Sequence, residues 1–185
     1  AASDVYKRQH YGINYNIKYW DLVVKDFIKF YNLNNNSSIL DVGCGKGFML
    51  YDFKRYLPNA MLKGVDISSY AIENSLEDIK KDLVVGDCKN LPFEDNSIEA
   101  CYSHMLYCMA LTNEDLENFN TEILRILKPG GKYYFCEHGI SPDLSTRVFQ
   151  NVTNVFYPKL SGGCHANRDI PKLISESGLK ILEKD

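Results

Sequence analysis

The chain has 185 residues, which is enough for one domain with a sizeable buried core. Its formal net charge of -3 gives no electrostatic reason to expect nucleic acid or an anionic lipid surface as a partner. No stretch approaches the roughly 20 consecutive apolar residues that cross a bilayer, so we expect no integral membrane segment.

The cysteines show no pattern of a metal site. The chain has six of them, without a C-x-x-C pair or the spacing of metal ligands. Several lie in apolar stretches, where a free cysteine behaves as a small hydrophobic residue. We therefore expect reduced thiols in a cytoplasmic protein, and we expect no metal.

The first half of the chain alternates between helical and extended patterns. A helix over about 19–32 would bury Val23, Phe27 and Phe30 on one face. An apolar run at 39–42 predicts a strand, 47–57 a helix, and 61–66 a second strand. Ser68 is suited to cap a helix with Ala71, Ile72 and Leu76 on its apolar face, before a short strand at 83–85.

The second half continues the alternation. A strand at 98–103 precedes a helix that Thr112 caps, and Lys128-Pro129-Gly130-Gly131 forms a turn after it. A strand follows at 132–136, then helices over about 143–157 and 169–177. Strands that alternate with helices predict an α/β fold with a doubly wound, mostly parallel sheet.

The stretch from Ile39 to Phe48 is the most informative in the chain. An apolar strand runs through Asp41 into glycines at 43, 45 and 47, and an amphipathic helix follows. Glycine there permits tight backbone conformations and lets a ligand approach without a Cβ in the way. Phe48 stands where a dinucleotide-binding fingerprint has a small residue, which argues against that class of site.

With Asp66 at the end of the next strand, this stretch resembles motif I of the class I S-adenosylmethionine-dependent methyltransferases. The resemblance runs from about residue 37 to the end of the sequence. It implies a Rossmann-like sheet of order 3-2-1-4-5-7-6, S-adenosyl-L-methionine as cofactor, an N-terminal tail or lid at 1–18, and a methyltransferase domain at 19–185. Because the sequence ends near Leu182, we expect strands 6 and 7 to be incomplete and the exposed edge of strand 5 to favour self-association.

The resemblance also implies which residues bind the cofactor. Those of the glycine turn border its amino-acid part, Asp66 accepts from both ribose hydroxyls, and Ile67 presses on the adenine or ribose face. Asp87 would accept from the adenine amino group, and Cys88 would offer its backbone N–H. The full implied set is Asp41, Gly43, Cys44, Gly45, Gly47, Asp66, Ile67, Asp87, Cys88 and Ser103.

The acceptor side is expected after strands 4 and 5, with His104, Glu137 and His138 as candidate catalytic residues. A histidine near its ordinary pKa can accept a proton from an acceptor nucleophile. Candidate substrate contacts are Tyr11, Tyr15, Tyr107 and His165. The alternative interpretation is that the histidines are ordinary surface or hydrogen-bonded residues and that the tyrosines pack on the first helix.

The segments 137–143 and 162–168 resemble a branch of phosphatidylethanolamine-type N-methyltransferases and related thiol methyltransferases. We therefore expect a small-molecule acceptor, with a lipid headgroup amine and a thiol as options. Two other functions stay open at this point. One is a methyltransferase-like domain that binds cofactor or a partner without turnover, and the other, which Phe48 disfavours, is a nucleotide-cofactor oxidoreductase.

Overall fold

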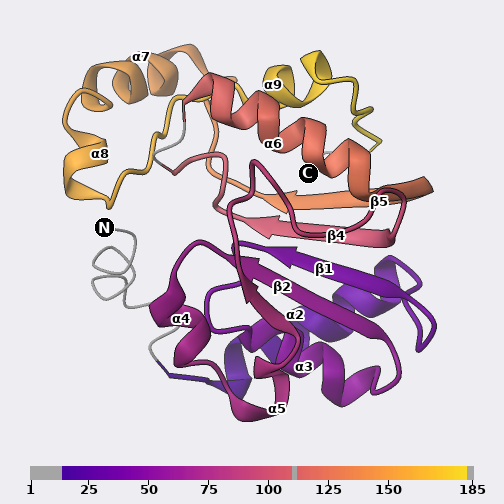
Figure 1. Ribbon diagram of the computed structural model, residues 1–185. Coiled ribbons are helices and arrows are strands. Elements are labelled where there is room, and N and C mark those ends of the chain that lie inside the picture. The colour runs from indigo at the N-terminus through magenta and orange to yellow at the C-terminus, as the bar shows by residue number, and fades with distance from the viewer. Residues whose placement is uncertain (1–13, 110–111, 183–185) are drawn as a thin grey trace.

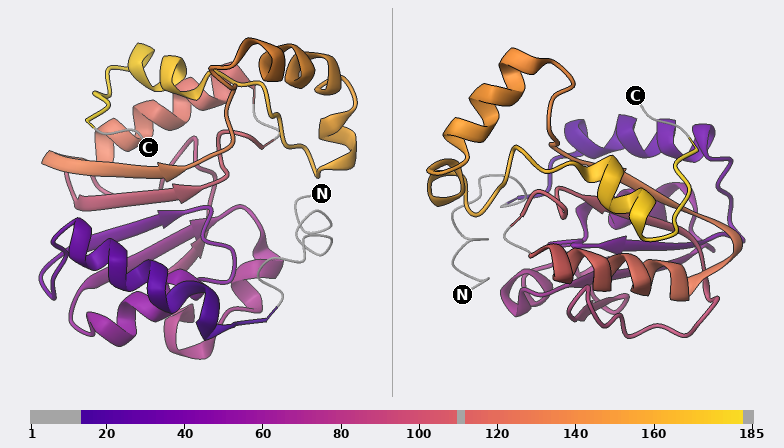
Figure 2. Two further views of the ribbon diagram at one scale, coloured as in Figure 1. Left: turned by 180° about the vertical axis from the view of Figure 1, so that it is seen from behind. Right: turned by 90° about the horizontal axis from the view of Figure 1, so that it is seen from above.

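A computed structural model describes residues 14–109 and 112–182, which form three layers with a sheet between two sets of helices (Figures 1 and 2). The sheet has five parallel strands in the order β3-β2-β1-β4-β5. Their bounds are β1 (Ser38–Val42), β2 (Met61–Asp66), β3 (Leu83–Val85), β4 (Ile98–His104) and β5 (Leu127–Cys136). The predicted Rossmann-like α/β fold is confirmed.

One face of the sheet is covered by the helices of the first half of the chain (Figure 2): α2 (Ile17–Phe30), α3 (Phe48–Tyr56), α4 (Ser69–Glu73) and α5 (Glu77–Lys80). The prediction for the buried face of α2 is partly wrong, because Val23 and Phe30 are exposed. Val24 is buried instead, and Trp20 and Phe27 pack against the same cluster. These three residues form an i, i+4, i+7 stripe, which is the face that a docked helix buries.

The other face is covered by α6 (Asn113–Ile126) and α9 (Ile170–Glu176), which lie together in all three views (Figures 1 and 2). The inner face of α6 is apolar, and Leu116, Phe119, Ile123 and Ile126 on it are fully buried. They pack on β1, β4 and β5 in a cluster that also contains residues of α9.

Two short helices, α7 (Leu144–Thr153) and α8 (Tyr157–Leu160), lie beyond the ends of the strands toward which the arrowheads point (Figure 1). Neither helix buries a residue. Large apolar side chains on them are exposed, including Phe149, Phe156 and Leu160. An apolar surface of this kind is uncommon on a monomeric protein and is often a binding surface.

Two predicted boundaries are wrong. Ser68 caps α4 as expected, but the helix ends at Glu73, and α5 begins only after Leu76. The expected turn from Lys128 to Gly131 lies within β5, where the register against β4 shifts between Ile98 and Ala100. Such irregularities depend on the partner strand, so periodicity along one segment does not reveal them.

Beyond β5, the described residues form no further strand, so β5 is an edge of the sheet as the structure describes it. An exposed edge offers unpaired backbone groups to another chain. Self-association through this edge stays a prediction.

The N-terminus of α6 offers a test of the capping assignment. Thr112 Oγ1 accepts from the N–H of Asp115 at 3.1 Å, and the Asp115 carboxylate accepts from the N–H of Thr112 at 3.0 Å. We expect Thr112→Ala to lower the free energy of unfolding by about 1 kcal/mol, because the N–H of Asp115 loses its acceptor at the helix end. Thr121→Ala, on the exposed surface of the same helix, is the matched control and should cost less. Equal losses in urea melts would contradict the assignment.

Candidate functional site

The turn that follows β1 depends on glycine. Gly43, Gly45 and Gly47 all have positive φ angles, of 81°, 54° and 72°. A Cβ on Gly47 would lie only 2.8 Å from Leu83 Cδ1, so this glycine permits close packing of the turn on β3. A Cβ on Gly43 would have only Leu106 Cδ1 nearby, at 3.8 Å. Gly43 is exposed, so it leaves open space at the edge of the sheet.

The carboxylate of Asp66 is fixed beside this turn. Its Oδ2 accepts from the N–H of Gly45 at 2.8 Å, and its Oδ1 accepts from the N–H of Ser68 at 2.8 Å. Burial raises the pKa of Asp66, although both N–H groups act to lower it. Each carboxylate oxygen can accept a further hydrogen bond, so the group is oriented for hydroxyls of a ligand.

Asp41 is a second buried acid at the same edge. Burial first, and then the charge of Asp66, raise the pKa of Asp41 to about 7. Among the described residues, no donor bonds to its carboxylate and no cation pairs with it. Asp41 is 7% exposed, so a ligand that carries positive charge can approach its carboxylate and would favour the ionised form.

The end of β3 adds the remaining predicted cofactor residues. Ile67, directly after β2, is 61% exposed. The Asp87 Oδ1 atom accepts from the N–H of Lys89 at 2.9 Å, while Cys88 is half-buried and burial raises its pKa to about 12. The carboxyl ends of β1, β2 and β3 therefore bring the predicted cofactor residues to one edge.

Two predicted site residues have buried side chains in this structure. Ser103 is fully buried, and its hydroxyl lies 2.5 Å from that of Tyr133. Tyr107, expected to contact substrate, is also fully buried and donates its hydroxyl proton to Asn120 of α6. Both side chains lie in the core that α6 covers, and their roles toward cofactor and substrate stay predictions.

Glu137 is placed as the acceptor-side prediction expects, but its hydrogen bonds indicate a different task. Its carboxylate accepts from the backbone N–H groups of Leu106, Tyr107 and Cys108, the last two at 3.0 and 3.2 Å. Burial raises its pKa to about 6 against the effect of these donors. Glu137 thus joins the exit of β5 to the segment 105–109 that follows β4.

The same segment is held from a third part of the chain. The Arg168 guanidinium donates to the carbonyl oxygens of Tyr107 and Met109, and the N–H of His165 donates to the carbonyl of Cys108. Segment 105–109 is therefore fixed by the Glu137 carboxylate, which accepts from its N–H groups, and by the Arg168 guanidinium, which donates to its carbonyls. Its conformation includes a positive φ of 57° at Met105.

The three acceptor-side histidines lie around this segment. His104 ends β4, and partial burial lowers its pKa, with a smaller contribution from the charge of neighbouring His138. His138 is exposed, directly after Glu137. His165 has Nδ1 3.2 Å from the amide nitrogen of Asn154, and burial followed by the charge of Arg168 lowers its pKa.

The sequence prediction missed Cys108 and Cys164. Both are buried, and their sulfur atoms and a ring nitrogen of His138 lie within 4.8 Å of one another. Long stretches of chain separate the three residues, so no local spacing signals the cluster. Only the folded sheet brings them together.

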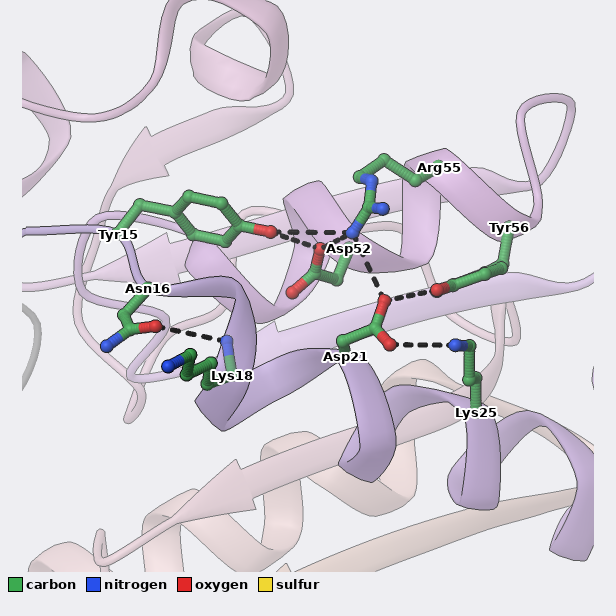
Figure 3. A network of polar contacts seen from close by, with 8 residues as sticks. All are labelled: Tyr15, Asn16, Lys18, Asp21, Lys25, Asp52, Arg55 and Tyr56. Carbon is green, nitrogen blue, oxygen red and sulfur yellow. Dashed lines mark hydrogen bonds and ion pairs between the residues drawn. The ribbon is translucent and has the colours of Figure 1, made fainter.

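The N-terminal segment is attached beside the glycine turn through Tyr15 (Figure 3). The Tyr15 hydroxyl donates to Asp52 Oδ1 at 2.6 Å, and its ring packs edge-on against Phe48 and Tyr51. Arg55 donates to the same Asp52 oxygen at 2.7 Å. Tyr15 thus packs on α3 through Phe48, Tyr51 and Asp52. Its role as a substrate contact stays a prediction. Tyr11 lies outside the described residues.

Surface hollows do not identify the site. One is lined by residues that include Lys54 and Lys81, and another by residues that include Tyr31 and Tyr134. Both lie toward the amino ends of the strands, and neither is lined by a predicted site residue. The site is instead defined by the chain segments that meet at the carboxyl edge.

Comparison with known proteins gives the family. Residues 40–135, more than half of the chain, match the model of the methyltransferase domain. This chain belongs to the class I S-adenosylmethionine-dependent methyltransferases. The predicted family and its cofactor, S-adenosyl-L-methionine, are confirmed.

The methyltransferase domain is similar to larger proteins. Sterol 24-C-methyltransferase of Candida albicans is 30% identical over 160 residues, which cover 83% of this chain and 39% of that protein. Phosphoethanolamine N-methyltransferase 2 of Haemonchus contortus, in complex with phosphomonomethylethanolamine and S-adenosylhomocysteine, has a TM-score of 0.71 at 20% identity. That alignment covers 96% of this chain and 44% of the solved one.

The same fold occurs with another chemistry. The cyclase SpnF has a TM-score of 0.69 at 21% identity, with 88% of this chain and 58% of that chain covered. The chain thus spans 39% of the sterol methyltransferase, 44% of the phosphoethanolamine N-methyltransferase and 58% of the cyclase. Among the described residues, no helix has the length and apolar character that crossing a bilayer requires.

Asp41 gives a test of the electrostatics. Between its ordinary pKa of 3.8 and about 7, the folded chain keeps a proton that the unfolded chain has released. The free energy of unfolding must therefore fall as pH rises through this window, by up to about 4 kcal/mol. Asp41→Asn cannot ionise, so it should be more stable than the parent at pH 8 and lose this advantage near pH 4. Thermal melts at both pH values check this.

The control is Asp26→Asn, on the exposed surface of α2, which should show no such difference between the two pH values. An Asp41→Asn variant that is less stable than the parent at pH 8 would contradict the electrostatic argument.

Proposed function

We propose that this chain binds S-adenosyl-L-methionine at the carboxyl ends of β1, β2 and β3 and transfers its methyl group to a small-molecule acceptor. The observation that supports this most is the convergence of the glycine turn, Asp41 and Asp66 on one edge. In open α/β sheets, ligands bind at this edge near the point where the strand order reverses, which here lies between β1 and β4.

The residues at the edge suit the cofactor. Asp66 has lone pairs directed away from its two backbone donors, which suits ribose hydroxyls. Gly43 leaves room for the amino-acid part, and Asp41 places negative charge near it. Ile67, Asp87 and Cys88 would border the adenine, as the family resemblance implies.

When bound, the cofactor supplies a methyl group on a positively charged sulfur, with a neutral thioether as leaving group. The main task of the chain is then to hold an acceptor in line with that methyl group. A base is needed only where the acceptor arrives protonated. The lowered pKa of His104 keeps its imidazole neutral near pH 7 and able to take that proton.

The acceptor side is formed by segments after β4 and β5. His104 and His138 stay candidates for the base, and His165 for a substrate contact. We assign Glu137 a positioning task, because its carboxylate holds segment 105–109 through three backbone N–H groups. The exposed apolar side chains of α7 and α8 beside this edge favour an acceptor with an apolar portion, such as a lipid amine, over a small polar thiol.

The cofactor assignment is tested by calorimetric titration of S-adenosylhomocysteine, and separately of NADH, into the purified chain. We expect binding of the first and none of the second. Asp66→Ala should bind roughly 10- to 100-fold more weakly, since it loses charged hydrogen bonds. Ligand at about 100 times its Kd should raise the free energy of unfolding by about 2.7 kcal/mol.

Asp82→Ala is the control for Asp66→Ala, because Asp82 pairs with Lys63 at the opposite end of the same strands. A folded chain that binds NADH instead would favour the oxidoreductase. The chain could also bind S-adenosylhomocysteine and yet form none from S-adenosylmethionine when amine and thiol acceptors are supplied. That result would favour a cofactor-binding domain without turnover.

A matched glycine pair separates ligand contact from backbone strain. Gly43 and Gly130 have φ angles of 81° and 80°, and an added Cβ would clash with no protein atom at either position. Alanine at either position should therefore cost similar folding stability. Only Gly43→Ala should also weaken S-adenosylhomocysteine binding, by at least about tenfold, because its Cβ would occupy ligand space. If the two variants bound S-adenosylhomocysteine with equal affinity, a close approach of the ligand to Gly43 would be excluded.

A further inference from the structure

A cluster of soft ligands lies at the meeting point of three chain segments. Cys108 follows β4, His138 follows β5, and Cys164 follows α8. One ligand atom from each, Sγ, a ring nitrogen and Sγ, lies within 4.8 Å of the other two. Both cysteines are buried, while the histidine is exposed.

Two thiols and an imidazole are a ligand set for zinc. Thiolate and imidazole select zinc among common divalent ions, whereas magnesium and calcium prefer oxygen. In a tetrahedral site with bonds of about 2.3 Å to sulfur and 2.0 Å to nitrogen, ligand atoms lie roughly 3.5–3.8 Å apart. The observed separations of up to 4.8 Å would need to close by about 1.3 Å at most.

The backbone that carries these ligands is already fixed. The N–H of Cys108 donates to Glu137 Oε2 at 3.2 Å, and its carbonyl accepts from His165 N–H at 2.5 Å. The carbonyl of Cys164 accepts from Ser161 Oγ at 3.3 Å. These bonds fix the backbone positions from which the two sulfur atoms project.

The local charges also balance. Arg168 is close enough to interact electrostatically with Cys108, Cys164 and Glu137. Its positive charge and the negative charge of Glu137 offset one another. Two thiolates would then neutralise one divalent ion, so the buried site would carry no net charge.

We propose that Cys108, His138 and Cys164 bind one zinc ion. Three protein ligands leave a fourth position, which opens toward solvent on the side of the exposed His138 and takes water. The ion would join the segments after β4, β5 and α8 at the acceptor side. A zinc ion on the His138 ring nitrogen would occupy the lone pair that a base needs, so with zinc bound His104 is the remaining candidate for the base.

The test is a zinc titration of the full chain, reduced and stripped with a chelator, in competition with a chromophoric zinc indicator. We expect one equivalent per chain and a rise in Tm on binding. His138→Ala and Cys164→Ser should each weaken binding by more than about 100-fold, since loss of a supporting residue alone costs 10- to 100-fold. His138 is exposed, so its variant should fold even where Cys164→Ser does not.

Cys136→Ser and His104→Ala are the controls, because both residues are exposed and outside the cluster. They should bind zinc as the parent does. A folded, reduced chain that takes up no zinc would overturn the proposal. So would zinc uptake that His138→Ala leaves unchanged, or a disulfide between Cys108 and Cys164 that forms in the presence of zinc.

Discussion

The structure depends on a backbone turn that only glycine makes without strain. After β1 the chain passes through three left-handed conformations, and each one serves a different neighbour. The N–H groups of Gly43 and Cys44 donate to the carbonyl of Val65, Gly45 donates to Asp66, and Gly47 lets the turn pack on β3. The turn thus fixes β1, β2 and β3 relative to one another, and with them every residue of the cofactor edge.

Much of this follows from local signals in the sequence. The five strands and their order could be predicted, because apolar periodicity locates the elements and the motif residues imply the topology. The caps Ser68 and Thr112 are also local, since their side chains bond to backbone only three residues away. Asp66 could be placed beside the glycine turn because the carboxyl ends of neighbouring parallel strands meet.

What could not be predicted depends on partners far along the chain. The sequence places Ser103 and Tyr107 at the end of a strand, where a site is expected. In the structure Tyr133 and Asn120 bond to their hydroxyls within the core. Glu137 looks like a catalytic residue, but its carboxylate accepts from three N–H groups of segment 105–109, which follows β4. A side chain's surroundings, more than its type or its place after a strand, decide its task.

The packing of α2 has a practical consequence. Its residue Trp20 is the one tryptophan of the chain, and it packs against the same cluster as α3. Next to it in sequence, Asp21 accepts from Arg55 and Tyr56 of α3. When light that tyrosine does not absorb excites the protein, its fluorescence therefore comes from a single tryptophan at the junction of these two helices. Its wavelength and quenching report, without any label, whether the N-terminal helix is docked beside the cofactor edge.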